Sequence, residues 1–236
     1  MAPRVTMLRT TPAVLMLTLT VIACGDAESQ NPAGPIERIH ADVPAIIDPS
    51  ARYLIYLHGA IIETNGVRPT HPVFGVYEYR KILRTFADRG FEVISEARPA
   101  GTDAGEYVGR VAAQVTALLE AGVPPEHVTI VGFSKGGGIA ILASSLLAND
   151  RLNFVFMASC GSWYADRPDI VPQGRMLGVR EASDDLAGSC DDLFSRAPDG
   201  SLWSEIVVEL GGGHGAFYRP HSEWVDPVVR WAFATR

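Results

Sequence analysis

The sequence predicts an α/β fold, with a doubly wound, mostly parallel sheet that carries helices on both faces. The first observation is an alternation of strand-like and helix-like segments from residue 53 to the end of the chain, the order typical of such sheets. The second is that the strand-like segments are apolar throughout rather than at every other position, as expected for strands covered on both faces. No insertion is long enough to form a large lid.

The predicted strands are short apolar runs rich in β-branched and aromatic residues. They are Tyr53–Leu57, Phe91–Ala97, Val128–Gly132, Phe154–Ala158, Met176–Val179 and Ile206–Leu210. Ligands of parallel sheets bind at the carboxyl ends of the strands. Functional side chains are therefore expected directly after these runs.

The predicted helices have apolar residues spaced three and four apart, or are apolar almost all round. They are Tyr77–Arg89, Tyr107–Ala121, Lys135–Ala148 and Ser222–Ala234. Gly90 and Gly122 follow the first two, as is typical of a helix C-terminus. Lys135–Ala148 is expected to be a buried helix because its own residues are small or apolar on almost every side.

Composition excludes several classes of protein. The 236 residues are 47% hydrophobic and 20% charged, which is enough to bury a core and argues against disorder. With a net charge of -7, the chain lacks the excess of basic residues that is typical of a nucleic-acid-binding protein. The histidines are scattered without zinc-ligand spacing, and no dinucleotide fingerprint follows the first strand. We therefore expect neither a metal nor a cofactor, and no nucleic-acid partner.

The first residues have the pattern of an export signal. Residues 1–23 combine Arg4 and Arg9 with an apolar run too short for a bilayer crossing, which needs about 20 residues. Val21-Ile22-Ala23-Cys24 resembles the lipobox of bacterial lipoproteins, which implies lipidation of Cys24; an ordinary cleaved signal is the alternative. We predict a signal peptide (1–23), a flexible polar tether (24–35) and a folded α/β domain (36–236), exported to the cell envelope and held at the membrane by lipid only.

A five-residue motif, Gly132-Phe133-Ser134-Lys135-Gly136, lies between a predicted strand and a predicted helix. This G-x-S-x-G pattern, in that context, predicts a nucleophilic serine on a sharp turn, where close neighbours must lack bulk. The alternatives are a glycine-rich turn with an incidental serine, or a phosphate-binding turn. A phosphate loop usually places its glycines before a Lys-Ser/Thr pair, which is absent here.

A serine nucleophile needs a neighbouring base. His214 lies in Gly211–Gly215, directly after the last predicted strand, where glycines let a loop bring an imidazole over the sheet edge. We predict His214 as the base. His221, beside Pro220 at a predicted helix start, is the competitor.

A third residue should orient the imidazole and offset its charge. Three acids follow the strand Met176–Val179, namely Glu181, Asp184 and Asp185. Asp184 is preferred because the loop has had room to turn there. Asp185 is the second choice and Glu181 the third.

The chain order Ser134, Asp184, His214 resembles that of the α/β-hydrolase family, over about residues 50–236. The dipeptide His58-Gly59 after the first strand is also similar to one found in many esterases and lipases. The resemblance implies cleavage of a carboxylic ester of a small-molecule acyl substrate through an acyl-enzyme. The family's first antiparallel strands are not evident, although Ile36–Ile39 or Ala45–Ile47 could be remnants.

The tetrahedral intermediate of this chemistry needs two preorganised N–H donors. We expect them from the backbones of Lys135, which follows the nucleophile, and Ala60, in the turn after His58-Gly59. The segment from His58 to Tyr79 could line the substrate pocket, with Glu63 and Tyr79 among its polar groups.

Arg98 follows the second predicted strand at the same edge of the sheet. A cation there could hold a substrate carboxylate. The alternative, which we favour, is an ion pair with Glu63 or Glu96.

Cys160 and Cys190 both follow strands that should be neighbours. In an exported protein these positions predict a disulfide, and two independent thiols are the alternative.

Two functional alternatives also stay open. One is a peptidase, thioesterase or acyltransferase with the same triad, because the fold does not decide among them. The other is a binding lipoprotein that keeps only the fold.

Overall fold

The computed structural model describes Met1 and residues 37–234. The predictions on the signal peptide, on lipidation of Cys24 and on the tether therefore lie outside the described residues. Within the described part of the chain, no helix is both long and apolar enough to cross a membrane.

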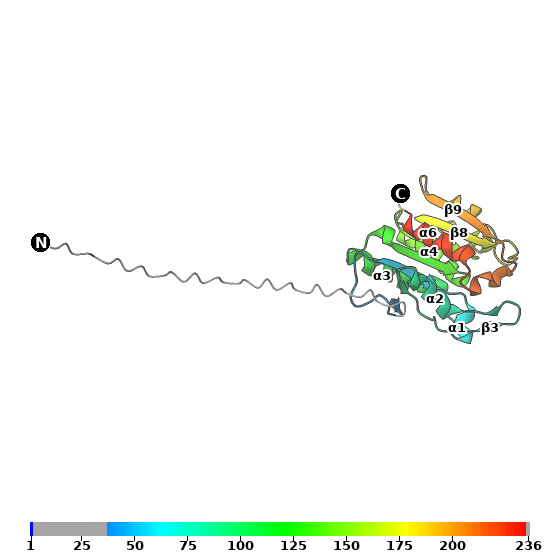
Figure 1. Cartoon of the computed structure of the whole chain (residues 1–236). Helices are drawn as coiled ribbons and strands as arrows, with labels where there is room; N and C mark the ends of the chain where they lie inside the picture. The colour runs from blue at the N-terminus through cyan, green and yellow to red at the C-terminus, as the bar shows by residue number, and fades with distance from the viewer. Residues whose placement is uncertain (2–36, 235–236) are drawn as a thin grey trace. The chain divides into compact units, whose positions relative to one another are not determined.

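The central sheet has seven strands, all paired in parallel, in the order β1-β5-β2-β6-β7-β8-β9 (Figure 1). The predicted fold class is confirmed. The strands are β1 (Ile39–His40), β2 (Arg52–Leu57), β5 (Phe91–Ile94), β6 (Val128–Phe133), β7 (Asn153–Met157), β8 (Arg175–Glu181) and β9 (Leu202–Val208).

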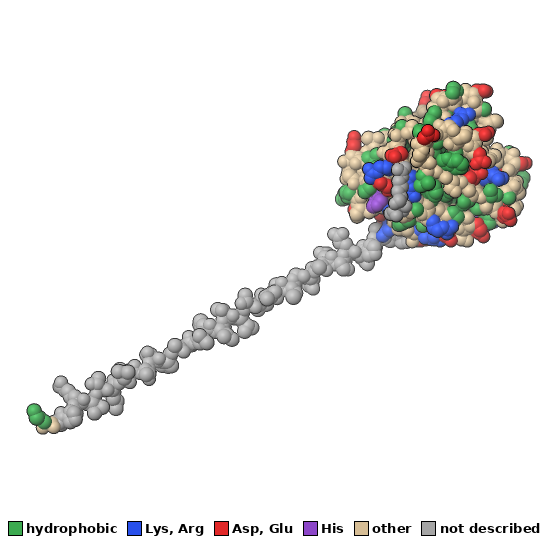
Figure 2. All heavy atoms as spheres, turned by 90° about the horizontal axis from the view of Figure 1, so that it is seen from above, with side chains coloured by type: hydrophobic (Ala, Val, Ile, Leu, Met, Phe, Trp, Pro, Cys, Tyr) green, Lys and Arg blue, Asp and Glu red, His purple; other side chains and the backbone are tan. Residues whose placement is uncertain are grey.

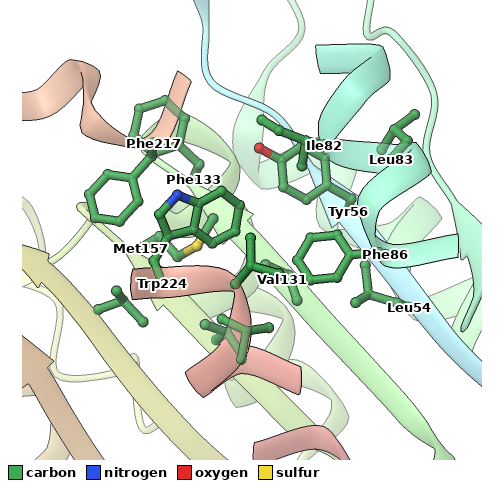
Figure 3. Packing of buried hydrophobic residues seen from close by; sticks show 14 of the residues in the cluster. Leu54, Tyr56, Ile82, Leu83, Phe86, Val131, Phe133, Met157, Phe217 and Trp224 are labelled. Atoms are coloured by element: carbon green, nitrogen blue, oxygen red, sulfur yellow. The ribbon is translucent and has the colours of Figure 1, made fainter. Parts of the chain in front are cut away.

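Helices cover both faces of the sheet, and each face has its own hydrophobic core. On one face, α2 (Tyr79–Asp88) and α6 (Ser222–Phe233) pack through residues such as Phe86 and Trp224 (Figure 3). The other face is covered by α3 (Ala104–Glu120), α4 (Lys135–Leu147) and α5 (Asp191–Phe194). Burial of both faces explains why the strand sequences are apolar throughout.

Short elements complete the described chain. They are α1 (Ile61–Asn65), an antiparallel hairpin of β3 (Thr70–His71) and β4 (Gly75–Val76), and the 3-10 helices η1 (Pro125–His127), η2 (Ser162–Tyr164) and η3 (Gly213–Tyr218). None of these was predicted. Elements of two to six residues contain too few positions for a period to be recognised.

Two predicted strands differ from the structure by more than two residues at one end. β5 stops at Ile94 rather than Ala97, although Ser95 still donates its backbone N–H to His40 O at 2.8 Å and its hydroxyl to Tyr56 O at 2.6 Å. β9 begins four residues before the predicted Ile206. As the edge strand it has one neighbour, so its apolar pattern is weaker. At the opposite edge, β1 pairs in parallel with β5, and Ala45–Ile47 is not a strand, so neither possible remnant forms an antiparallel strand within the described residues.

The surface carries both signs of charge. On the face drawn in Figure 2, acidic and basic side chains lie interspersed among polar and apolar ones.

Candidate active site

Ser134 lies on a strained turn between β6 and α4. Its backbone has φ 53° and ψ -121°, the left-handed region that a non-glycine residue adopts only when its surroundings enforce it. A Cβ at Gly132 would lie 2.2 Å from Gly136 O, and one at Gly136 would lie 2.0 Å from Leu57 O. The two glycines are therefore required by close backbone packing, which holds the serine at the carboxyl edge of the sheet.

Three predicted side chains form a hydrogen-bonded chain at this edge. His214 Nε2 lies 2.9 Å from Ser134 Oγ, and His214 Nδ1 lies 2.9 Å from Asp184 Oδ2. The Asp184 carboxylate is fully buried and also accepts the backbone N–H of Leu186 at 2.9 Å. A carboxylate acceptor at Nδ1 fixes the tautomer that leaves Nε2 free to accept the serine proton.

The other two candidate acids have different surroundings. Asp185 is exposed. Glu181 is buried, and its carboxylate accepts N–H groups of Ser183, Leu210 and Gly211. Burial raises the pKa of Glu181, but these hydrogen bonds outweigh it and hold the pKa below its ordinary value. Glu181 thus ties the loop that carries Asp184 to the loop that carries His214.

The histidine loop depends on glycine. Gly211 and Gly213 have φ of 68° and 52°, values that glycine adopts without strain. A Cβ at Gly215 would lie 2.2 Å from the Cβ of Phe74. The hairpin β3–β4 therefore packs directly against this loop. The competing His221 is the N-cap residue of α6.

Two backbone positions suit an oxyanion hole. Lys135 is the first residue of α4, and Ala60 is the N-cap residue of α1. N–H groups in the first turn of a helix lack partners within the helix. The predicted donors therefore both lie at helix starts.

The three residues predicted to bind substrate are bonded to other protein groups. Arg98 is buried and donates from Nε to Glu63 Oε1 at 3.0 Å, so the ion pair with Glu63 is the alternative that forms. The Tyr79 hydroxyl lies 2.7 Å from Ser95 Oγ. None of Glu63, Tyr79 and Arg98 is among the described residues that line the cleft beside Ser134.

His58 is held as a neutral ring. Its Nε2 accepts the backbone N–H of Arg98 at 2.9 Å, so Nδ1 carries the proton and donates to Gly59 O at 2.9 Å. Burial and the nearby Arg98 charge lower the pKa of His58 from 6.5 to about 4. These contacts make His58 a brace for the turn rather than a candidate base.

The cleft beside Ser134 has a volume of about 490 Å³. Its wall includes Ser134 and His214 together with groups that sequence analysis did not identify, among them Leu142, Trp163 and Leu186. Trp163 and Leu186 are exposed apolar side chains. An aromatic residue a few positions after a strand is a weak signal, and the sequence contains no stronger one for this wall.

Cys160 and Cys190 form a disulfide, with their Cα atoms 5.1 Å apart. Cys160 lines the cleft, and its carbonyl accepts the N–H of Gly188 at 2.9 Å. The disulfide therefore joins the cleft wall to the segment that follows Asp184. Among the residues that the structure describes, no group of three or more His, Cys, Asp and Glu side chains could hold a metal ion.

No family model matches this chain, and no curated protein matches it in sequence. Solved structures do resemble it. A truncated carbohydrate esterase from gut microbiota is 13% identical, with a TM-score of 0.52 over 81% of this chain and 90% of that one. SOBER1 of Arabidopsis thaliana is 15% identical, with a TM-score of 0.52 over 77% of this chain and 97% of that one.

ATU1826 of Agrobacterium tumefaciens, a protein of unknown function whose description names the α/β hydrolases, is 17% identical. Its TM-score is 0.51 over 78% of this chain and 86% of that one. At these identities the likeness concerns the fold alone. Together with the parallel seven-stranded sheet, it places the chain in the α/β-hydrolase fold.

Proposed function

We propose that this protein is a serine hydrolase that cleaves carboxylic esters through an acyl-enzyme. The observation that carries the proposal is the hydrogen-bonded chain from Asp184 through His214 to Ser134, with both contacts at 2.9 Å. It lies at the wall of an open cleft. The strained backbone of Ser134 supports the same conclusion, because such strain clusters at functional sites.

The geometry suits a two-step mechanism. Ser134 Oγ attacks the acyl carbon while His214 Nε2 takes its proton, and Asp184 stabilises the imidazolium. The N–H groups of Lys135 and Ala60 bind the developing oxyanion. His214 then returns the proton to the leaving alcohol. Water, activated by the same histidine, releases the acid from Ser134.

A fluorophosphonate probe tests the nucleophile. We expect it to label the wild-type protein and not Ser134→Ala, and we expect hydrolysis of p-nitrophenyl esters to follow the same pattern. A folded wild-type protein that is neither labelled nor active would instead favour a binding protein that keeps the fold. A peptidase, thioesterase or acyltransferase with the same triad is the second candidate. Activity on peptides or thioesters exceeding that on every ester would favour it.

We also propose that the protein is exported and anchored by a lipid on Cys24. The support comes from the sequence of residues 1–24 and from the Cys160–Cys190 disulfide, a bond that persists in oxidising compartments. Metabolic labelling with a fatty-acid analogue should mark the wild-type chain and not Cys24→Ser. Equal labelling of both would contradict the anchor.

A further inference from the structure

We propose that the Glu63 carboxylate is a positioning group for the oxyanion hole. It ties the turn that carries Ala60 to Lys135, and so sets the separation of the two N–H donors. This inference rests on the proposed hydrolase function. It also gives Glu63 and Arg98 a role other than the substrate contact that the sequence suggested.

The first step is the direct tie between the two donor segments. Lys135 Nζ donates to Glu63 Oε2 at 2.7 Å and to Thr102 O at 2.5 Å. Glu63 lies in α1, three residues after Ala60, while Lys135 opens α4 directly after the nucleophile. One ion pair therefore connects the two segments that supply the oxyanion donors.

The second step is the set of contacts by which Arg98 holds the turn before Ala60. Arg98 binds Glu63 Oε1 through Nε and the carbonyl of His58 through Nη2. The backbone N–H of Arg98 also holds the His58 ring at 2.9 Å. Because His58 and Gly59 directly precede Ala60, this network holds the backbone of the turn as well as the Glu63 side chain.

The third step concerns burial. The Glu63 side chain is 4% exposed, and that of Arg98 is fully buried. A charge pair in such surroundings is little screened and holds its geometry well, whereas a surface pair contributes little. Both carboxylate oxygens of Glu63 are already bonded to cations, which leaves it poorly suited to bind a substrate.

The fourth step links position to rate. An oxyanion hole accelerates acyl transfer because its donors are fixed where charge develops, and loss of one donor typically costs about 10²–10³ in kcat. A donor that is loosened rather than removed should cost less. The loss should fall on kcat and not on KM, because the oxyanion exists only in the transition state and intermediate.

The chain offers a matched pair of lysines for the test, because Lys81 and Lys135 are its only two. Lys81 also pairs with a glutamate, Glu78, at 3.0 Å, but in α2 at the surface. We expect Lys135→Met to lower kcat for a p-nitrophenyl ester by about tenfold or more, with KM within about twofold. Phenylboronic acid forms a tetrahedral adduct with serine, and its inhibition constant should rise by a similar factor. Lys81→Met should change none of these.

Glu63→Gln separates positioning from two other roles. Positioning predicts a lower kcat. If instead the net positive charge of Glu63, Arg98 and Lys135 stabilised the oxyanion directly, Glu63→Gln would remove a negative charge and raise kcat. If Glu63 contacted the substrate, Glu63→Gln would raise KM. If Glu63→Gln does not fold, Lys135→Met decides, because it leaves the buried Glu63–Arg98 pair intact.

The outcomes distinguish this inference from the proposed function. An active wild-type protein whose Lys135→Met variant keeps the kcat of Lys81→Met would overturn the positioning role alone. A wild-type protein with no esterase activity and no fluorophosphonate labelling would overturn the hydrolase proposal, and the positioning role with it.

Discussion

Asp184 and Asp185 are adjacent in the chain but differ in their surroundings. The Asp184 carboxylate is buried against His214, while Asp185 is exposed. We expect Asp184→Asn to lower kcat/KM by about 10³–10⁴, because an amide no longer enforces the required imidazole tautomer. Asp185→Asn should stay within about twofold of wild type, since surface changes are usually small. Ester hydrolysis by both variants tests this prediction. Equal losses of kcat/KM in the two variants would contradict the assignment of Asp184 as the residue that orients His214.

His58 predicts a pH dependence of stability. Its pKa is lowered to about 4 in the folded protein, mainly by burial, and returns to about 6.5 on unfolding. Between these values the unfolded chain binds more protons, so stability is full above about pH 6.5 and falls as the pH drops towards 4. This one group should remove about 2 kcal/mol between pH 7 and pH 5.

Urea unfolding at pH 7 and pH 5 measures this effect. His58→Gln should be less stable at pH 7, because the contacts with Arg98 and Gly59 O are weakened, but its stability should depend less on pH. His221→Gln serves as the control, since His221 lies at the start of α6. An unchanged pH dependence in His58→Gln would contradict the assignment.

At the scale of elements, the turn between β6 and α4 depends on its glycines. Gly136→Ala would place a methyl group 2.0 Å from Leu57 O, which is backbone and cannot move aside. We expect a loss of more than about 3 kcal/mol or no folded protein, because overpacking against a fixed backbone is among the costliest changes.

Gly138→Ala is the matched control two residues along the same helix. Its methyl group would meet only a Trp163 ring carbon, at 3.7 Å. Replacing a helical glycine by alanine typically stabilises by up to about 1 kcal/mol. Thermal unfolding of both variants makes the comparison. A Gly136→Ala protein as stable as Gly138→Ala would show that the turn is less constrained than the backbone packing indicates.

The segment after β7 supplies one wall of the cleft through Trp163, and its role in selectivity can be tested. We expect Trp163→Ala to raise KM for aryl and long-chain esters by about tenfold and for acetate esters much less, because the indole offers a large apolar surface to a bulky group. Trp203→Ala is a close control, since the two side chains are 44% and 43% exposed and Trp203 stacks on Phe194. Equal effects on both ester classes would contradict a role for Trp163 in selectivity.

At the scale of the whole molecule, the features that follow from a local residue pattern can be predicted from the sequence. The apolar strand runs and the glycines around Ser134 predict a parallel sheet with a turn at one edge, and the structure has both. The position of His214 directly after the last strand follows from the same rule. The rest depends on tertiary contacts. The pairing of Glu63 with both Arg98 and Lys135 joins α1, the segment after β5 and the start of α4, and no local period encodes it.

The Cys160–Cys190 disulfide acts on the same scale, because it joins the loops after β7 and β8 across a separation of 30 residues. In the loop-entropy model, such a link stabilises the fold by about 3–4 kcal/mol. We expect the double variant Cys160→Ser/Cys190→Ser to lose stability of this order in urea. A thiol assay in denaturant should find two more thiols in the wild type after reduction than before. Equal thiol counts would mean that the disulfide is absent in solution. If the counts differ but the double variant is as stable as wild type, the bond forms without stabilising the fold.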